Sequence, residues 1–311
     1  MKYENYYRAF RQSLQSITKK LTFLLVCICL WGCSSPDRGK GIRVVASYSV
    51  LCDLVEQLGA EPRCLINYDR DPHTYEGTPQ DRKAIEEADV IFYGGLNFEP
   101  SIIKMIRATN SPAPKIAIHE SPKIKIIQGD PHIWHDVENG ITIVKLLAQT
   151  LQQIDPSNSQ TYEQNLQNLI QELTNLDRWI AQQITTIPPT KRRLVTTHDA
   201  FSYYARAYGL TIEGTLLGIS TEEEPTAAQV KNLIDRVRRA EVPTLFAELT
   251  ANDKVLRNVA KEAGVKISDR VLIADGIGKP GTPEDSYQGM LIYNTCTIVA
   301  GLGGKCSPFN K

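Results

Sequence analysis

The chain has 311 residues, with 35 basic and 35 acidic side chains and 42% hydrophobic residues. This balance excludes intrinsic disorder, which requires low apolar content or a high net charge. It also argues against a nucleic-acid-binding protein, because such domains carry a strong positive excess on one face. We therefore expect a globular protein of about two domains with no nucleic-acid partner.

The first 32 residues have the pattern of an export signal. Basic residues end in Lys19-Lys20, and the apolar run 21–31 follows. This run is too short for a membrane-spanning helix, which needs about 20 residues, but it suits the apolar core of a signal peptide. It ends in Trp31-Gly32-Cys33-Ser34, which resembles a bacterial lipobox, where cleavage precedes a cysteine that carries lipid. We expect residues 1–32 to be a lipoprotein signal peptide, Cys33 to be lipidated and residues 33–41 to be a tether. A plain signal peptide is the alternative.

Export also affects the interpretation of the cysteines, because an exported protein folds in an oxidising compartment. The mature chain has Cys52, Cys64, Cys296 and Cys306 besides Cys33. Four thiols allow three pairings, of which Cys52–Cys64 and Cys296–Cys306 close the shortest loops. Four free buried thiols are the alternative. No C-x-x-C pair is present among them, so a thiolate metal site is not expected.

Residues 42–150 alternate strand-like runs with helical ones. The short strand-like runs, rich in β-branched or aromatic residues, are 42–47, 64–67, 90–94 and 115–119. Helical stretches occur at 51–58 and 79–88, and the second opens with Thr78 as a cap before Pro79. Alternation of this kind predicts a parallel α/β sheet. We expect residues 42–150 to form an N-terminal α/β lobe.

A different pattern begins near residue 157. Apolar residues recur at spacings of three and four up to Ile184, while Gln, Asn and Glu fill the other positions. This predicts one amphipathic helix over 157–187, about 45 Å long at 1.5 Å per residue. Because this helix lies between two α/β segments, we expect residues 151–189 to bridge two lobes.

Strand–helix alternation then resumes over residues 190–311. The predicted strands are 192–197, 211–217, 244–249 and 266–274, and the predicted helices are 200–208, 226–240, 252–263 and 287–299. The expected fold class is therefore α/β, with two Rossmann-like lobes that contain parallel sheets and are joined by one long bridging helix. Open α/β sheets bind ligands at the carboxyl ends of their strands, and two lobes add the cleft between them.

The five histidines carry the strongest chemical signal. Two of them stand in the same tripeptide, Asp71-Pro72-His73 and Asp130-Pro131-His132. Proline restricts its own backbone and that of the preceding residue, so each histidine is presented on a stiff loop. The neighbouring carboxylate is placed to orient the ring through its second nitrogen.

Two further candidates end strands of the second lobe. His198 follows the strand 192–197, and Asp275 follows the strand 266–274. Three histidines and one aspartate, drawn equally from both lobes, suffice to bind a divalent transition metal. His119 and His135 are weaker candidates, and Glu248, at another strand end, is expected to be structural rather than to support the site. There is no G-x-S-x-G motif and no Walker or Rossmann glycine loop, which argues against serine hydrolase or nucleotide chemistry.

These residues resemble the zinc- and manganese-binding solute-binding lipoproteins of bacterial ABC importers. The matching segments span nearly the whole mature chain and are Asp71–Glu76, Ala88–Asn97, Asp130–Asp136, Thr196–Phe201 and Ala274–Gly276. The resemblance implies that His73, His132, His198 and Asp275 are the metal ligands. It also implies two lobes on one long helix, an ABC permease as partner, an extracytoplasmic location, a lipid anchor in the membrane and a monomeric receptor.

The resemblance bears on the choice of metal as well. The third ligand position is glutamate in many manganese receptors of this family and is His198 here, whereas the histidine-rich loop of many zinc receptors is missing between the first two ligands. Imidazole ligands favour zinc over manganese, and one carboxylate would leave a filled site with a charge of about +1. We expect zinc, with manganese as the second candidate.

An enzyme is the competing functional class. Three histidines and a water form a known catalytic zinc site, as a lipid-anchored zinc-dependent hydrolase would have. A fourth protein ligand would close the coordination shell, so we expect a carrier and not an enzyme. A purely structural surface lipoprotein would bind no ion.

Overall fold

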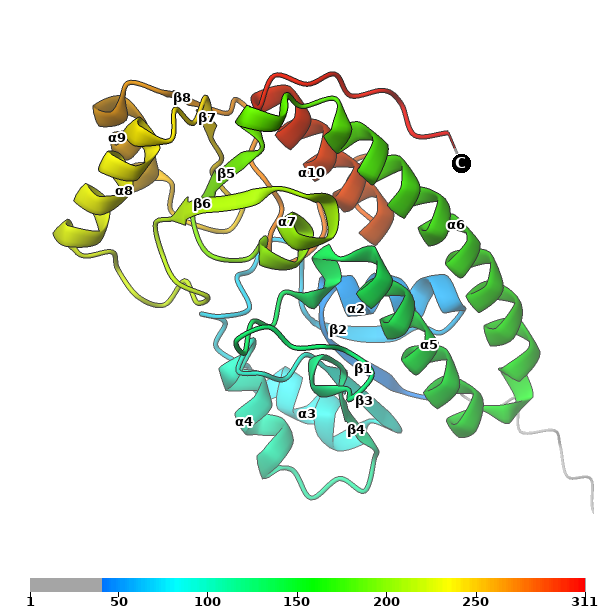
Figure 1. Ribbon diagram of the computed structural model, residues 1–311. Helices are drawn as coiled ribbons and strands as arrows, with labels where there is room; N and C mark the ends of the chain where they lie inside the picture. Colours follow the sequence, from blue (N-terminus) through cyan, green and yellow to red (C-terminus); the bar gives the residue numbers. More distant parts are fainter. Residues whose placement is uncertain (1–40, 311) are drawn as a thin grey trace, which may run out of the picture. The chain divides into compact units, whose positions relative to one another are not determined.

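The computed structural model describes residues 41–310, and its first lobe is built on four parallel strands (Figure 1). β1 (Val44–Tyr48) lies between β2 (Pro62–Ile66) and β3 (Val90–Tyr93), and β3 also pairs with β4 (Lys115–Ala117). The sheet order is β2-β1-β3-β4. All five residues of β1 are buried, as expected for a central strand that is covered on both faces.

Helices and single turns connect these strands. α3 begins as the sequence predicts, because Thr78 accepts the N–H of Asp81 and the Asp81 carboxylate accepts the N–H of Thr78. The remaining elements of this lobe are α2 (Ser49–Leu58), α3 (Pro79–Glu87), α4 (Pro100–Ala108), η1 (Ile118–Glu120) and η2 (Ile133–His135).

A long helix links the first lobe to the second. After α5 (Val137–Ile154) and the short turn η3 (Pro156–Asn158), α6 runs over Ser159–Thr185, close to the predicted 157–187. α6 packs on α2 and α5 of the first lobe and on α7 (Ser202–Tyr208) and α10 (Tyr287–Gly301) of the second, so its apolar stripe spans both (Figure 1). The bridging helix predicted from the three- and four-residue spacing of apolar residues is therefore present.

The second lobe contains two short parallel pairs of strands. β5 (Arg193–Thr196) pairs with β6 (Thr211–Thr215), and β7 (Thr244–Leu245) pairs with β8 (Lys266–Ile267). Single parallel bridges join Thr196 to Phe246 and Glu248 to Leu272. The helical elements are η4 (Pro189–Lys191), α7 (Ser202–Tyr208), α8 (Ala227–Arg239), α9 (Lys254–Ala263) and α10 (Tyr287–Gly301).

The strand predicted over 266–274 is mostly irregular. Beyond β8, the backbone of Ile273 bonds to a side chain, because its N–H donates to Asn294 Oδ1 at 2.9 Å and its carbonyl accepts from Asn294 Nδ2 at 2.8 Å. An amide from α10 thus replaces a neighbouring strand just before Asp275. The fold class, α/β with parallel sheets in two lobes, is confirmed.

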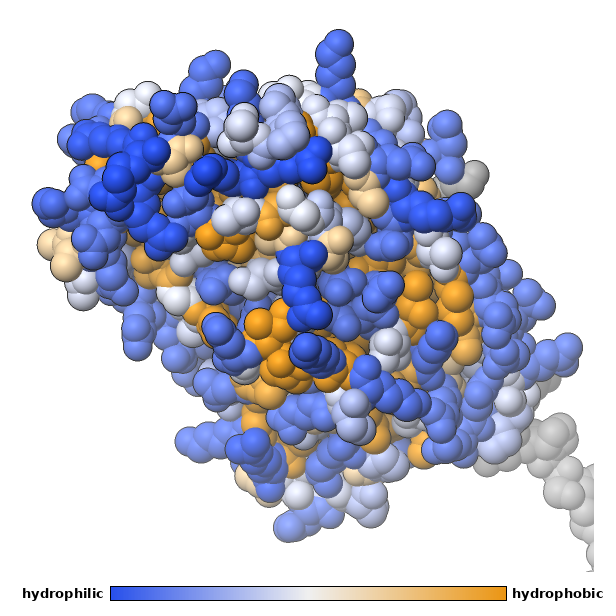
Figure 2. Space-filling model, in the orientation of Figure 1, coloured by the Kyte–Doolittle hydropathy of each residue, from blue (hydrophilic) through white to orange (hydrophobic). Residues whose placement is uncertain are grey.

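The solvent-facing helices of the second lobe are strongly polar. α8 buries Leu233 and Val237, and α9 buries Leu256, Val259 and Ala260. Figure 2 shows hydrophilic colouring over the outward surface of these two helices. They therefore cover one side of the sheet and have no apolar face left to bury.

Both of the locally paired disulfides are formed. Cys52 of α2 is bonded to Cys64 of β2, and Cys296 of α10 is bonded to Cys306 of the C-terminal segment. The alternative of four free thiols is wrong. The first bond ties a helix to its neighbouring strand, and the second ties α10 to the end of the chain.

The predicted signal peptide (1–32) and the lipidated Cys33 lie outside the described residues, as does all but the last residue of the predicted tether (33–41). Within the described part of the chain, no helix combines the length and the apolar character that a bilayer crossing would require. Residues 42–311 form one unit. Its division into segments 42–150, 151–189 and 190–311 stays a prediction.

The junction of the lobes includes a close approach of α10 to α5. The Tyr287 hydroxyl donates to the Trp134 carbonyl at 2.6 Å, and the Tyr287 N–H donates to Asp53 Oδ2 at 2.8 Å. The Tyr287 ring lies directly over Gly140 of α5, where a β-carbon would come within 2.9 Å of Cζ and closer still to the hydroxyl oxygen. Only glycine leaves room for this contact.

We therefore expect Gly140→Ala to destabilise the protein. Overpacking costs about 1–3 kcal/mol, which outweighs the stabilisation of about 1 kcal/mol that alanine normally brings to a helix interior. Urea unfolding followed by circular dichroism measures the difference. Gln171→Ala, at an exposed position of α6, is the control and should change stability by less than about 0.5 kcal/mol. A stabilised Gly140→Ala protein would contradict the close approach.

Candidate metal centre

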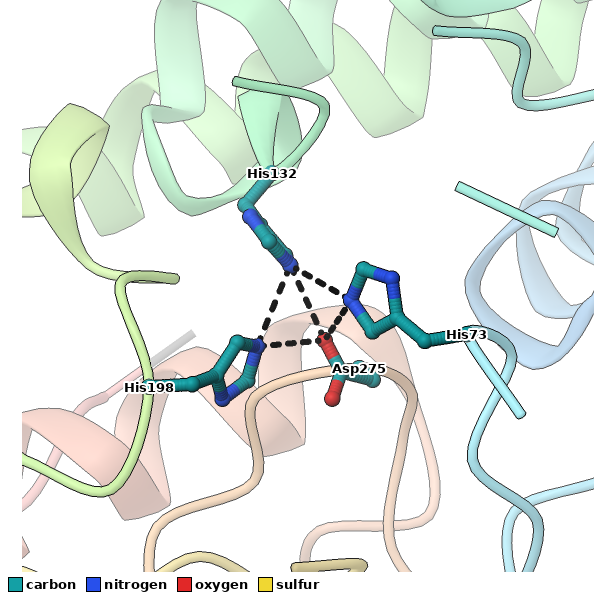
Figure 3. A group of neighbouring side chains, drawn as sticks. All are labelled: His73, His132, His198 and Asp275. Atoms are coloured by element: carbon teal, nitrogen blue, oxygen red, sulfur yellow. Dashed lines mark hydrogen bonds and ion pairs between the residues drawn. The ribbon is translucent and has the colours of Figure 1, made fainter. Parts of the chain in front are cut away.

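Four buried side chains converge between the two lobes (Figure 3). His73 lies in the loop between β2 and α3, and His132 immediately precedes η2. His198 follows β5, and Asp275 follows the bridge of Leu272 with Glu248. All four residues are at most 4% exposed. The sequence predicted this set, and the structure brings all of its members together.

The distances between the ligand atoms match a four-coordinate ion. His132 Nε2 lies 3.3 Å from the Nε2 atoms of His73 and His198, and 3.2 Å from Asp275 Oδ1. Asp275 Oδ1 lies 3.4 Å from His198 Nε2 and 3.8 Å from His73 Nε2. Ligands at zinc's usual bond lengths, arranged as a tetrahedron, are separated by about 3.3–3.4 Å. Four of these five separations are close to the tetrahedral value and the fifth is longer, and all the ligand atoms lie within 4.8 Å of one another, so the group is somewhat wider than an ideal tetrahedral site.

Asp275 Oδ1 has no hydrogen-bond donor of its own. It is a buried carboxylate oxygen without a hydrogen-bond partner, although the three Nε2 atoms surround it. A buried charge without a partner is costly. A cation at the centre of the group would satisfy this oxygen and the three nitrogen lone pairs together.

Asp130 orients the His132 ring, as the tripeptide predicts. Its Oδ1 accepts the backbone N–H of His132 at 2.9 Å and lies 2.7 Å from the ring Nδ1. With the Nδ1 proton directed to the carboxylate, Nε2 is left to face the other three side chains of the group. The short Asp-Pro-His segment therefore supplies both a candidate ligand and the carboxylate that sets its tautomer.

The same role predicted for Asp71 is wrong. Asp71 Oδ1 accepts only the backbone N–H of His73, at 2.9 Å, and its Oδ2 accepts the Thr221 hydroxyl at 2.5 Å. The loop geometry is shared by the two tripeptides, but the carboxylate of the first is directed to the second lobe and not to its own histidine ring.

Glu248 is the residue whose role was underestimated from the sequence. One of its oxygens accepts the N–H groups of Thr197 and His198 at 2.9 and 3.0 Å, and the other makes a short hydrogen bond with His198 Nδ1. The signal for this role is its place at the end of the strand beside β5, since neighbouring parallel strands end at the same edge. Glu248 fixes the His198 ring as Asp130 fixes that of His132.

These contacts separate the pKa values of the three rings. Burial lowers the pKa of His73 to about 3, because no carboxylate hydrogen bond compensates for the lost solvation. Burial also lowers the pKa of His132, but the hydrogen bonds and charges of Asp130 and Asp275 outweigh it and raise this pKa. In the same way, Glu248 and Asp275 raise the pKa of His198 well above its ordinary value.

The carboxylate of Asp275 is held ionised. Burial raises its pKa, but the positive charge of the nearby His198 ring and the close His132 ring lower it by more, so the net pKa lies well below the usual range. The centre therefore offers an anionic oxygen to a cation at neutral pH.

The charge around the centre is more negative than the ligands alone suggest. Asp130 and Glu248 lie directly behind two of the ligand rings, in addition to Asp275 within the group. A divalent ion and three ionised carboxylates have a net formal charge of −1. The four ligands alone still give the expected value of about +1, and the two further carboxylates weaken the electrostatic argument against manganese.

The other two histidines lie outside the group. His119 is buried and its Nε2 is 2.7 Å from the Tyr48 hydroxyl, while burial lowers its pKa to about 3. His135 Nε2 donates to the carbonyl of Ala274 at 2.8 Å, which fixes the backbone just before Asp275. Neither residue belongs to the group of four, and His135 bonds the backbone of the loop that carries Asp275.

Comparison with known proteins identifies the family of the chain. The sequence profile of the family described as zinc-uptake complex component A, periplasmic, matches residues 44–301. The metal ABC transporter substrate-binding lipoprotein SsaB of Streptococcus sanguinis is 32% identical over 91% of this chain and 97% of the relative. The manganese ABC transporter substrate-binding lipoprotein PsaA of Streptococcus mitis is 31% identical over 91% of this chain and 96% of the relative.

A solved structure has the same fold. The periplasmic zinc-binding protein TroA of Treponema pallidum superposes with a TM-score of 0.80 at 29% identity, covering 84% of this chain and 99% of that one. The family consists of substrate-binding proteins and not of enzymes, so the hydrolase alternative has no support. From its two parallel-sheet lobes, its central helix and the extent of these matches, the chain belongs to the ZnuA family of extracytoplasmic metal-binding lipoproteins of ABC transporters.

Proposed function

We propose that this protein captures a divalent transition metal, zinc in preference to manganese, and delivers it to an ABC permease. The proposed ligands are His73, His132, His198 and Asp275. The observation that carries the proposal is their geometry, because four potential ligand atoms, all within 4.8 Å of one another, come from two lobes and are buried. A site of this kind requires nothing from solvent to complete its coordination.

The preference for zinc rests on the ligand types. Three imidazole nitrogens and one carboxylate oxygen at tetrahedral separations suit zinc, whereas manganese favours more oxygen ligands in octahedral geometry. The relatives' names include both metals, since PsaA is named for manganese and TroA for zinc. The net formal charge of −1 keeps manganese as the second candidate.

A closed set of four protein ligands also suits a carrier. Catalytic zinc sites keep one position for water or substrate, and here a side chain occupies each of four positions.

We infer that the protein acts as a monomer, in which segments 42–150 and 190–311 are the lobes and segment 151–189 is the bridge. We also propose a lipid on Cys33, which the relatives' designation as lipoproteins supports. Fatty-acid labelling that survives Cys33→Ser would exclude it.

Competition between metals tests the proposed cargo. Mature protein stripped of metal should bind one zinc ion. Zinc should displace manganese at equal concentrations, because sites with imidazole ligands have a higher affinity for zinc than for manganese. Isothermal titration calorimetry with each metal alone, and then with zinc added to the manganese-loaded protein, measures this order. Tighter binding of manganese would reverse the assignment of the cargo but would leave the site itself intact.

Substitution of a single ligand tests the site. His198→Ala should greatly weaken zinc binding, because it removes one of four ligands and leaves the buried Glu248 without its ring partner. His119→Ala should keep wild-type affinity, since this equally buried histidine bonds Tyr48 and not the centre. Both affinities are measured by calorimetry on proteins whose folding is verified by circular dichroism. Unchanged zinc affinity in His198→Ala would refute the ligand assignment.

Zinc affinity should fall as the pH is lowered. Raised pKa values mean that His132 and His198 take up protons at higher pH than ordinary histidines, and a metal must displace those protons from Nε2. His73, with a pKa of about 3, does not compete in this range. We expect the dissociation constant to rise by about tenfold per pH unit for each proton displaced. Titrations between pH 5 and pH 8 measure it, with His119→Ala as the matched control, and a flat profile would contradict imidazole ligation.

A further inference from the structure

The two lobes contact each other unevenly around the metal centre. On the side of α2, η2 and α10, hydrogen bonds between the lobes are numerous. They link Asp53 with Tyr287, Gln57 with Gln288, Ser49 with Ile277, Trp134 with Tyr287, His135 with Ala274 and Ile127 with Tyr203. This side of the junction is fixed by many independent contacts.

The opposite side is formed by the segment 67–78, which carries His73 and is called here the His73 loop. Its own hydrogen bonds run mostly back into the first lobe. The Tyr75 hydroxyl donates to Asp81 at 2.8 Å, and the Gly77 N–H donates to the Ser101 hydroxyl at 3.0 Å. Within residues 41–310, the one hydrogen bond from this loop to the second lobe joins Asp71 and Thr221, at 2.5 Å.

That hydrogen bond reaches a proposed metal ligand through the Asp71 carboxylate. The Thr221 hydroxyl donates to Asp71 Oδ2, while Asp71 Oδ1 accepts the backbone N–H of His73 at 2.9 Å. One carboxylate therefore connects the second lobe to the backbone of His73. A hydrogen bond to an ionised group is among the stronger kinds, and within the described residues the loop makes no second one to the other lobe.

His73 also lacks the support that the other two rings have. Asp130 holds His132 and Glu248 holds His198, but in the described part of the chain no group bonds Nδ1 of His73. Its ring packs edge-on against Phe98, 5.1 Å between centroids. The position of this ligand therefore depends on where its loop is held.

The His73 loop has space beside it. A cavity of about 300 Å³ is lined by Tyr68 and Asp69 of the loop and by Leu249, Thr250 and Ile273 of the second lobe. Leu249 is 45% exposed, the most exposed large hydrophobic side chain of the described residues. The loop can therefore shift on this side without first displacing a packed core.

We propose that the hydrogen bond between Thr221 and Asp71 controls the rate at which the bound metal leaves. Thr221 is a positioning residue that keeps the His73 loop against the second lobe, and its loss lets His73 withdraw from the ion. This inference rests on the proposed function, because it assigns a release step to the same four-ligand site. Related binding equilibria differ mainly in their dissociation rates, so the effect should appear there.

Replacement of the Thr221 hydroxyl tests the proposal. Thr221→Val removes the donor at nearly the same size, and Thr221→Ser keeps it. Zinc-loaded mature protein is mixed with an excess of a chromogenic chelator, and the release of zinc is followed by stopped flow. We expect Thr221→Val to release zinc about tenfold faster or more, the effect of losing a hydrogen bond to a charged group, and Thr221→Ser to release it at the wild-type rate.

Thr250→Val is the matched control. Thr250 lies on the opposite wall of the cavity in the same lobe, and within residues 41–310 it makes no hydrogen bond, so its release rate should equal that of the wild type. Thr221→Ala repeats the removal of the hydroxyl in case valine disturbs the loop, and thermal unfolding without metal verifies that each variant is folded.

The outcomes are distinct. A wild-type protein that binds no zinc would refute the proposed function itself. If wild type binds one zinc but Thr221→Val and Thr221→Ala release it at the wild-type rate, the role of Thr221 is wrong and the site remains. The role is equally wrong if Thr221→Ser or Thr250→Val releases zinc as fast as Thr221→Val.

Discussion

The metal centre depends on two hydrogen bonds between carboxylates and imidazoles, from Asp130 to His132 and from Glu248 to His198. A neutral imidazole carries its proton on either nitrogen, and only the tautomer with a bare Nε2 can bind metal here. A carboxylate beside Nδ1 fixes that tautomer and the rotation of the ring. The same bonds pair one oxygen of Asp130 and one oxygen of Glu248, residues that are themselves only 3% and 2% exposed and would be costly to bury unpaired.

The fold supplies these pairs because parallel strands end at a common edge. His198 follows β5, and Glu248 follows the strand next to it, so ligand and support meet without any specialised loop. The ligands of the first lobe lie on connections between its strands and helices. The junction between the lobes then determines whether the two halves of the site coincide. α6 spans both lobes, and the side chain of Tyr287, at the start of α10, packs directly on Gly140 of α5.

Much of this arrangement could be predicted from local patterns. The two Asp-Pro-His tripeptides indicated two ligands, and the strand ends indicated His198 and Asp275. The heptad-like spacing over 157–187 predicted α6 nearly to its ends. These features depend on periodicity and on backbone restriction by proline, which act over a few residues and so can be recognised in one sequence.

The features that could not be predicted depend on distant partners. Asp71 and Asp130 stand in the same tripeptide, yet one bonds a threonine 150 residues away and the other bonds its own histidine ring. The strand predicted over 266–274 is reduced to β8, and near its predicted end the side chain of Asn294 in α10, rather than a neighbouring strand, bonds the backbone groups of Ile273. The role of Glu248 requires knowledge of which strand lies beside β5. In each case the tertiary neighbour, and not the local propensity, determines the outcome.

A carrier must both hold its ion and release it, and the structure assigns these demands to different contacts. The carboxylates behind His132 and His198 affect the basicity of the ligands, so they change how tightly the ion is held in every state of the protein. The contact between Asp71 and Thr221 touches no ring and alters no ligand atom. The free energy of this hydrogen bond therefore matters only when the His73 loop moves. With its four side chains at most 4% exposed, the centre is closed to solvent, so an ion leaves only when some part of the site moves. His73 has no carboxylate behind its ring, and its loop has one hydrogen bond to the second lobe. Displacing His73 therefore disturbs fewer interactions than displacing any other ligand. Tight binding and timely release can then be adjusted separately, since the first depends on paired rings in the centre and the second on a hydroxyl outside it.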